Sequence, residues 1–151
     1  MEGKDILTGY SDSVPLVLVV DDDESDRELA ERGLGARGLN CRVDFAEDGQ
    51  AALDYLLNPT GELPSLVLLD LKMPRVNGHE VLRQVRENDR TRICPVVVFT
   101  SSGQPSDILG CFENGANSYV RKAIDFDQYI ARVQDVAKYW LRLNEPAPGR
   151  I

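Results

Sequence analysis

The sequence predicts an α/β fold in which a parallel β-sheet carries helices on both faces. Short apolar segments of strand character alternate with amphipathic segments of helix character five times along the 151 residues, which is the pattern of strand–helix–strand units. In addition, apolar and polar residues do not alternate in segments 14–20, 66–69 and 95–100, as they would in a strand with one solvent-exposed face. Continuous apolar runs are typical of strands that are buried on both sides of a parallel sheet.

The first half of the chain contains two predicted strands, each followed by a predicted helix. Residues 14–20 are mostly Val and Leu and lead into three consecutive aspartates. Residues 24–37 place apolar side chains on one stripe at helical spacing, and two glycines near the end of this segment terminate the helix. Residues 40–46 alternate apolar and polar side chains, which indicates a strand nearer the edge of the sheet. A second helix, over 48–57, ends at an Asn-Pro pair.

The second half of the chain repeats this alternation three times. Two of its strands are apolar throughout, and an Asn-Gly turn precedes the first of its helices. The last helix is the longest predicted element. In chain order we expect strands at 66–69, 95–100 and 118–121 and helices at 80–87, 106–113 and 125–143.

The length fits one domain, which we place at 14–144 between flexible segments at 1–13 and 145–151. With 25 acidic and 17 basic residues and a formal net charge of −8, broad binding to nucleic acid or to anionic membranes is disfavoured. The three cysteines lack Cys-x-x-Cys spacing, which argues against a disulfide framework or a structural zinc site. We find no signal-peptide pattern and no apolar run of about 20 residues, so we expect a cytoplasmic protein that makes no membrane contact.

Charged and hydroxyl side chains follow the predicted strands at the points where the strands end. They are Asp21, Asp22, Asp70, Thr100 and Lys122. Because the carboxyl ends of parallel strands meet at one edge of the sheet, these groups converge. Carboxylates about 4 Å apart repel by on the order of 4 kcal/mol per pair at an effective dielectric constant of 20, so a cation is needed among them. The oxygen ligands suit Mg²⁺, and a carboxylate beside a metal, a lysine and a hydroxyl is suited to accept a phosphoryl group.

These residues and their neighbours resemble the receiver domains of two-component response regulators. The resemblance extends over about 16–143. It implies a flavodoxin-like fold with a doubly wound, five-stranded parallel sheet of order 2-1-3-4-5. It depends on Val20-Asp21-Asp22, on 69–74 followed by Gly78, on Thr100-Ser101, and on 115–122.

The resemblance implies that Asp70 is the phospho-acceptor. It also implies that Mg²⁺ is held by Asp21, Asp22, Asp70 and the backbone carbonyl of Lys72. Such a protein is not an enzyme in the ordinary sense. It takes up a phosphoryl group from a donor in the presence of Mg²⁺ and loses that group slowly by hydrolysis.

Three further site residues receive roles from the resemblance. Thr100 would hydrogen-bond the phosphoryl group and move toward it on activation, and Tyr119 would turn inward when Thr100 moves. Lys122 would form an ion pair with the phosphoryl oxygens. The family normally has a proline after this lysine, usually with a cis peptide bond, whereas this chain has Ala123. A cis bond before a non-proline residue costs about 3–4 kcal/mol, so we expect a trans Lys122–Ala123 bond.

Further similarities lie in Asp48-Gly49 with 52–53 and the long loop after it, in 95–98 before Thr100, in Asn117 before Tyr119, and in the tail from 125–127 to 139–141. In these residues the chain resembles one subgroup more closely, the single-domain regulators that are paired with phytochrome-type sensor histidine kinases. This implies that the donor histidine lies on a sensor kinase, which passes the phosphoryl group to this chain in a phosphorelay. The lone His79 follows an Asn-Gly turn and is interpreted as an exposed residue at a helix start. We expect no output domain and no direct DNA binding, so the signal would be a phosphorylation-dependent surface change.

The last predicted helix carries two apolar stripes about 100° apart. The first stripe is expected to cover the sheet, and the second is expected to lie near solvent and to form an interface. Proteins of the subgroup tend to dimerise through the fourth helix, the fifth strand and the fifth helix, so a homodimer is expected there. The first stripe is Phe126, Ile130, Val133, Ala137 and Trp140, and the second is Tyr129, Arg132, Val136, Tyr139 and Leu143.

Three other functions fit parts of the sequence less well. A phosphatase of the haloacid-dehalogenase type needs a carboxylate two residues after the nucleophile as general acid, and this chain has Lys72 there. A flavodoxin-like cofactor binder needs a phosphate cradle after the first strand, where the acidic run would repel a phosphate. A degenerate receiver that only binds partners is supported by Ala123 alone.

Overall fold

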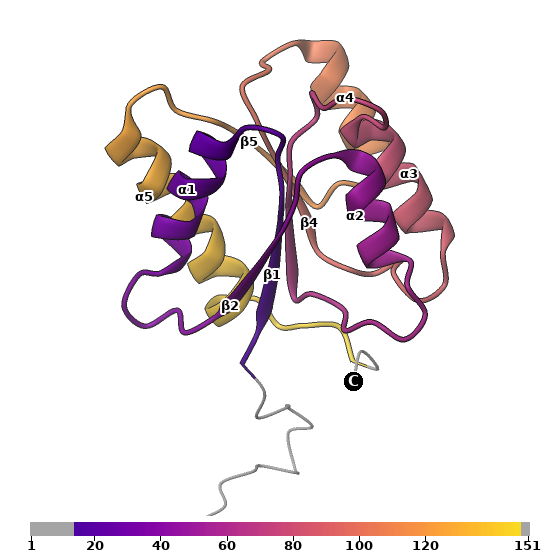
Figure 1. Ribbon diagram of the computed structural model, residues 1–151, viewed down its shortest axis with the longest axis horizontal. Coiled ribbons are helices and arrows are strands. Elements are labelled where there is room, and N and C mark those ends of the chain that lie inside the picture. The colour runs from indigo at the N-terminus through magenta and orange to yellow at the C-terminus, as the bar shows by residue number, and fades with distance from the viewer. Residues whose placement is uncertain (1–13, 149–151) are drawn as a thin grey trace, which may run out of the picture.

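The computed structural model describes residues 14–148. Within this range, one five-stranded sheet has the strand order β2-β1-β3-β4-β5, and all of its neighbouring strands are parallel (Figure 1). The predicted fold class and strand order are therefore confirmed. The strands are β1 (Leu16–Val20), β2 (Arg42–Ala46), β3 (Leu66–Leu69), β4 (Val96–Thr100) and β5 (Ser118–Arg121).

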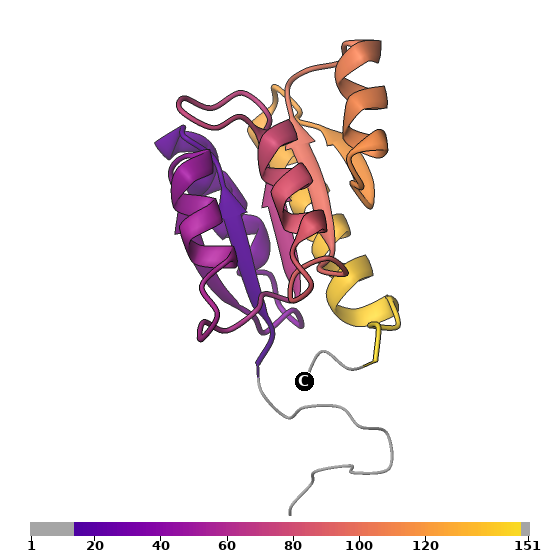
Figure 2. The same ribbon diagram turned by 90° about the vertical axis from the view of Figure 1, so that its right-hand side faces the viewer.

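Helices cover both faces of the sheet. α1 and α5 pack together on one face, while α2 and α3 lie side by side on the other with α4 next to them (Figures 1 and 2). The helices are α1 (Glu24–Leu34), α2 (Gly49–Leu56), α3 (Gly78–Glu87), α4 (Pro105–Glu113) and α5 (Phe126–Lys138), and α5 continues into the π-helical turn η1 (Tyr139–Leu143).

The central strands supply side chains to two separate apolar cores. Successive residues of a strand point to opposite faces, so β1 places Leu18 and Val20 in the core under α2 and α3 and Val17 and Val19 in the core under α1 and α5. All residues of β1, β3 and β4 are buried. This explains why the sequence shows continuous apolar runs in place of alternation.

The predicted stripes of the last helix are corrected by the structure. Phe126, assigned to the core stripe, is 66% exposed, whereas Tyr129, assigned to the interface stripe, is only 4% exposed. The Tyr129 ring packs against Phe99 of β4 at a centroid distance of 5.0 Å. Its hydroxyl donates to the Asp26 carbonyl at 3.4 Å. The face that meets the sheet is centred on Tyr129, Val133 and Ala137 and so lies between the two predicted stripes.

The chain ends are described in part. The predicted flexible segment 1–13 and residues 149–151 lie outside the described residues, and residues 145–148 form neither helix nor strand. Among residues 14–148, no helix combines the length and the apolar character needed to cross a membrane. The domain boundaries at 14 and 144 stay a prediction.

Candidate functional site

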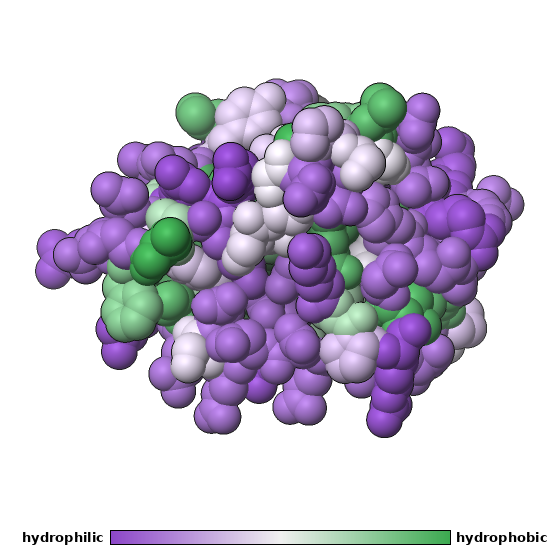
Figure 3. Space-filling view, turned by 90° about the horizontal axis from the view of Figure 1, so that it is seen from above, coloured by the Kyte–Doolittle hydropathy of each residue, from purple (hydrophilic) through white to green (hydrophobic). Residues whose placement is uncertain are grey.

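Strand register brings the predicted site residues to one edge of the sheet. Val20 is paired with Leu69, so the residues that follow them, Asp21 and Asp70, lie side by side. The ladder extends by one hydrogen bond here, because the Asp70 amide donates to the Val20 carbonyl at 3.0 Å. Viewed onto this edge, the surface is mainly hydrophilic with scattered apolar side chains (Figure 3).

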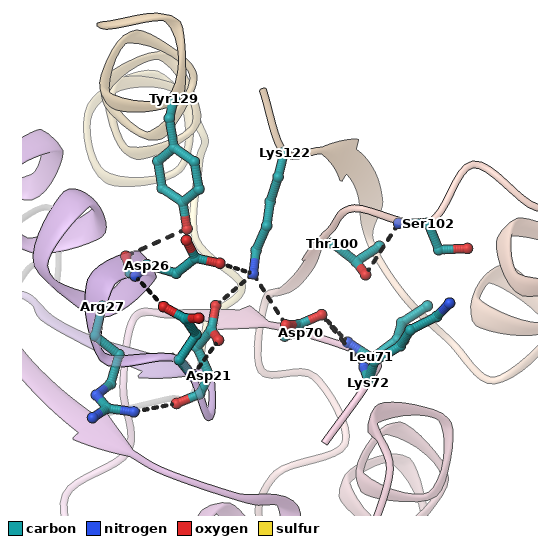
Figure 4. A network of polar contacts seen from close by, with 11 residues as sticks. Asp21, Asp26, Arg27, Asp70, Leu71, Lys72, Thr100, Ser102, Lys122 and Tyr129 are labelled. Atoms are coloured by element: carbon teal, nitrogen blue, oxygen red, sulfur yellow. Dashed lines mark hydrogen bonds and ion pairs between the residues drawn. The ribbon is translucent and has the colours of Figure 1, made fainter. Parts of the chain in front are cut away.

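Lys122 occupies the centre of the site (Figure 4). Its backbone amide donates to the Thr100 carbonyl at 2.8 Å, which fixes where the side chain starts. The ammonium group then lies 2.7 Å from Asp21, 2.7 Å from Asp26 and 3.0 Å from Asp70. An ammonium has three N–H donors, so each carboxylate takes one. With the side chain only 7% exposed, these contacts are shielded from solvent.

The carboxylates decide the protonation state of Lys122. Burial by itself lowers the pKa of this ammonium, but the charges and hydrogen bonds of Asp70, Asp21 and Asp26 outweigh burial and raise the pKa above its usual value. Lys122 is therefore charged. The Lys122–Ala123 bond is trans, since residues 14–148 contain no cis peptide bond. The departure at Ala123 thus leaves the lysine directed into the site.

Asp26 is a site residue that the sequence analysis missed. It lies in the first turn of α1, which begins at the N-cap Asp23, and its carboxylate reaches Lys122 across the edge of the sheet. In the sequence it stands within an acidic run on the polar side of an amphipathic helix. Nothing in the pattern separates it from its acidic neighbours, and the signal lies in the position of α1 over the strand ends.

The two oxygens of Asp70 have different partners. Oδ1 accepts from the backbone amide of Leu71 at 2.7 Å and more weakly from that of Lys72 at 3.4 Å. Oδ2 faces the Lys122 ammonium. The carboxylate is buried and its plane is fixed by these contacts, so Asp70 is held in one orientation at the end of β3. The Lys72 side chain is exposed, and the ligand role predicted for its carbonyl stays a prediction.

Asp21, Asp22 and Asp70 together have the donor set for a divalent cation. One carboxylate oxygen from each lies within 4.8 Å of the others. Burial raises the pKa of Asp21 to about 6, in spite of the opposing effect of Lys122. Three carboxylates contact the one ammonium, and that of Asp22 lies close to two of them. A hard cation with oxygen ligands fits this site.

Thr100 and Tyr119 are connected through Ser102. The Thr100 side chain is buried, and its hydroxyl oxygen accepts from the Ser102 amide at 3.4 Å (Figure 4). The Tyr119 hydroxyl donates to the Ser102 carbonyl at 2.8 Å. The two residues predicted to act as a switch therefore contact the same residue of the segment between β4 and α4.

His79 is half-buried, which corrects its interpretation as an exposed residue. Its Nε2 lies 3.3 Å from Oδ1 of Asp107 and its Nδ1 lies 3.8 Å from Sγ of Cys111. α4 covers the ring closely, since a Cβ added at Gly110 would lie 3.1 Å from its Cε1. The position of α4 over the start of α3 is a tertiary feature, and the local sequence around His79 does not contain it.

Comparisons with known proteins agree with this geometry. The family model of the response regulator receiver domain matches residues 17–134. The probable methanogenesis regulatory protein FilR2 of Methanothrix harundinacea is 39% identical over 137 residues, which is 89% of this chain and 88% of FilR2. Response regulator Rcp1 of Synechocystis is 30% identical over 140 residues, 89% of this chain and 95% of Rcp1.

Solved structures of response regulators are also similar to this chain. The Mn²⁺-bound form of response regulator Rcp1 superposes with a TM-score of 0.83 at 28% identity, covering 88% of this chain and 99% of that one. The phosphorylated cyanobacterial phytochrome response regulator RcpA also gives 0.83, at 26% identity, with 89% of this chain and 99% of that one covered.

Proposed function

This chain belongs to the family of response regulator receiver domains, which accept phosphoryl groups in two-component signalling, and on that premise we propose that Asp70 is the acceptor. The observation that carries the proposal is the environment of its carboxylate. Asp70 lies at the end of central strand β3, and it is held by backbone amides on one oxygen and by the Lys122 ammonium on the other. The phosphoryl donor would be a histidine of a sensor kinase.

The transfer needs one nucleophile and a means to balance charge. A carboxylate oxygen of Asp70 attacks phosphorus, and the P–N bond to the donor imidazole breaks as the P–O bond forms. The imidazole leaves with the electron pair of the broken bond and takes a proton from solvent. Phosphoryl transfer depends mainly on positioning and charge neutralisation. Lys122 would supply positive charge to the phosphoryl oxygens, and Thr100 would donate a hydrogen bond to them.

We propose Mg²⁺ as the cofactor, held by Asp21, Asp22, Asp70 and the backbone carbonyl of Lys72. The ion would neutralise negative charge on the phosphoryl oxygens and on the carboxylates. The all-oxygen donor set of the three aspartates supports this assignment. The existence of a Mn²⁺-bound form of the related Rcp1 supports a divalent cation.

The proposed output is a change of surface. Phosphorylation adds about −1.5 to −2 charges, which would shift the equilibrium of the segment that carries Thr100 and its partner Tyr119. The chain would thus signal by conformation, with self-phosphorylation from a donor and slow self-dephosphorylation as its only chemistry. We keep the prediction that the chain does not bind DNA directly.

Two protein partners are proposed. The first is a sensor histidine kinase of the phytochrome type, which is supported by the similarity of this chain to the phytochrome response regulator RcpA. The exposed Ile124 and Phe126, which follow Lys122 closely, give such a partner an apolar contact beside the site. The second partner is another copy of this chain, bound through α4, β5 and α5. Tyr139 and the 75% exposed Leu143 remain available for this contact and Val136 is half-buried, while the buried Tyr129 is not available.

The proposal is tested by intact-protein mass spectrometry after incubation with acetyl phosphate. Wild-type protein with Mg²⁺ should gain one phosphoryl group, and the adduct should be lost with EDTA and in Asp70→Asn. Asp127→Asn removes an exposed aspartate in the first turn of α5 and should be labelled as fully as wild type. Full labelling of Asp70→Asn would overturn the acceptor assignment. A wild type that neither gains an adduct nor binds Mg²⁺ would favour the degenerate receiver.

A further inference from the structure

Asp26 provides the third carboxylate that contacts the Lys122 ammonium, and it comes from a helix, whereas the other two follow strands. Its Oδ2 lies 2.7 Å from Nζ, as close as that of Asp21 and closer than that of Asp70 at 3.0 Å. Figure 4 shows Asp21 and Asp26 on one side of the ammonium and Asp70 on the other. Because an ammonium has three N–H donors, Asp26 occupies one that the two strand-end carboxylates do not use.

The fold fixes Asp26 beside the end of β1. Its backbone amide donates to the carboxylate of the α1 N-cap at 2.9 Å, and its carbonyl accepts from the Tyr129 hydroxyl at 3.4 Å. The next residue, Arg27, donates from its guanidinium to the Asp21 carbonyl at 2.8 Å, which ties the first turn of α1 to the end of β1. These contacts keep the Asp26 carboxylate within reach of the ammonium.

The three carboxylates around Lys122 differ in what else they are placed to bind. Asp21 and Asp70 belong, with Asp22, to the acidic group whose oxygens lie within 4.8 Å of one another, and among residues 14–148 this group does not include Asp26. The Oδ2 atoms of Asp21 and Asp70 that accept from Lys122 therefore belong to proposed metal ligands. Asp26 contacts the ammonium without that second role.

The ammonium and a divalent cation compete for the same carboxylates. A lysine paired only with Asp21 and Asp70 would place its positive charge directly beside a cation on those residues, and the two like charges repel. Solvent screens this repulsion little, because the Lys122 side chain is only 7% exposed. Asp26 opposes the repulsion in two ways, since it balances the ammonium charge and holds one of its N–H groups. Both effects favour the cation.

We propose that Asp26 is a positioning residue that holds and neutralises the Lys122 ammonium, so that this lysine and a divalent cation can share the site. The inference rests on the part of the proposed function that places Mg²⁺ on Asp21 and Asp70. It gives Asp26 no contact with the cation or with the phosphoryl group. Asp26→Asn keeps the size of the side chain and an acceptor oxygen but removes the charge. It should therefore weaken the binding of the cation.

The test is isothermal titration calorimetry of the full chain with Mg²⁺ and, separately, with Mn²⁺, at constant pH and ionic strength. Asp26→Asn should raise the Kd of either cation about five- to twentyfold. Asp26→Glu restores the charge at the same position and should bring the Kd back to within about threefold of wild type. A residue that only packed would show no such recovery, because Glu differs from Asp in size more than Asn does.

The matched control is Glu28→Gln, which removes an equal charge from an exposed position of the same helix. Water and salt screen that position, so the Kd should stay within about twofold of wild type. Equal affinity of wild type and Asp26→Asn would overturn the proposal, as would a Kd as high in Glu28→Gln or in Asp26→Glu as in Asp26→Asn. A wild type that binds Mg²⁺ and takes up no phosphoryl group contradicts the proposed phosphoryl transfer alone, whereas one that binds neither cation contradicts both proposals.

Discussion

The two helices nearest the C-terminus, α4 and α5, lie on opposite faces of the sheet and are held there very differently (Figure 1). α5 buries Tyr129, Val133 and Ala137 against the sheet and α1. α4 buries a single residue, Cys111, and leaves Leu109 and Phe112 exposed. Local stability follows the amount of buried apolar contact. The face with α5 is therefore suited to hold the site in place, and the face with α4 is suited to move when the site changes.

The largest expected effect comes from removing the Lys122 ammonium, which lies on the more firmly packed side of the molecule, beside α1. Lys122→Ala leaves the carboxylates of Asp21, Asp26 and Asp70 without their ammonium partner. Breaking a buried ion pair by removal of one partner costs about 3 kcal/mol or more, so the free energy of unfolding in EDTA should fall by about 3 kcal/mol. Asp70 of this variant should also accept a phosphoryl group less readily, and the surface change that follows phosphorylation should be lost.

Urea denaturation measures this loss, with Lys138→Ala as the control. Lys138 is an exposed lysine in the last turn of α5, and its removal should change stability by less than about 0.5 kcal/mol. Equal stability of Lys122→Ala and wild type would contradict the view that the contacts of the Lys122 ammonium with Asp21, Asp26 and Asp70 stabilise the fold.

Binding of a divalent cation at the acidic cluster of Asp21, Asp22 and Asp70 should raise the free energy of unfolding. An ion that binds only the native state adds about 2.7 kcal/mol at a concentration of about 100 times its dissociation constant. Urea denaturation in Mg²⁺ and in EDTA measures this gain. It should be retained in Asp127→Ala and reduced in Asp22→Ala, because Asp22 contributes an oxygen to the acidic cluster. An undiminished gain in Asp22→Ala would remove that residue from the metal site.

A matched pair of glycine substitutions compares the packing of the two helices. At Gly33 of α1, an added Cβ would lie 2.7 Å from Cβ of Val133 in α5, whereas at Gly110 of α4 it would lie 3.1 Å from the edge of the His79 ring. Overpacking costs about 1–3 kcal/mol, and alanine regains up to about 1 kcal/mol of helix propensity.

Gly33→Ala should therefore lower the free energy of unfolding by about 1–2 kcal/mol, while Gly110→Ala should stay within about 0.5 kcal/mol of wild type. Thermal and urea denaturation of the two variants give the comparison. The reverse order of stabilities would show that α4 is the more tightly packed helix.

Sequence reasoning predicted the sheet and the strand-end residues because those features are local. Continuous apolar runs define the strands, and the residue after each run necessarily falls at the edge of the sheet. The role of Asp26, the burial of His79 and the exposure of Phe126 depend on how helices dock on the sheet. Neighbouring stripes of a helix differ by about 100°, and their apolar content does not decide which one meets the sheet. That choice is made for α5 by the Tyr129 ring, which packs on Phe99.

The smallest expected effect is a difference between two buried thiols. Cys94 and Cys111 are both fully buried, the first in the segment before β4 and the second on α4. A thiol reagent reaches such a side chain only when the surrounding structure opens. If α4 opens locally while β4 opens with the whole fold, Cys111 should be labelled at least about tenfold faster than Cys94 under native conditions. Peptide mass spectrometry of labelled protein distinguishes the two sites, and Cys41→Ser removes the half-exposed third thiol.

His79→Leu should increase the labelling of Cys111 and leave that of Cys94 unchanged, because His79 contacts Cys111. Equal labelling of the two thiols in wild type would mean that α4 opens only with the rest of the molecule. The distinction between a rigid and a mobile face would then have no basis in local stability.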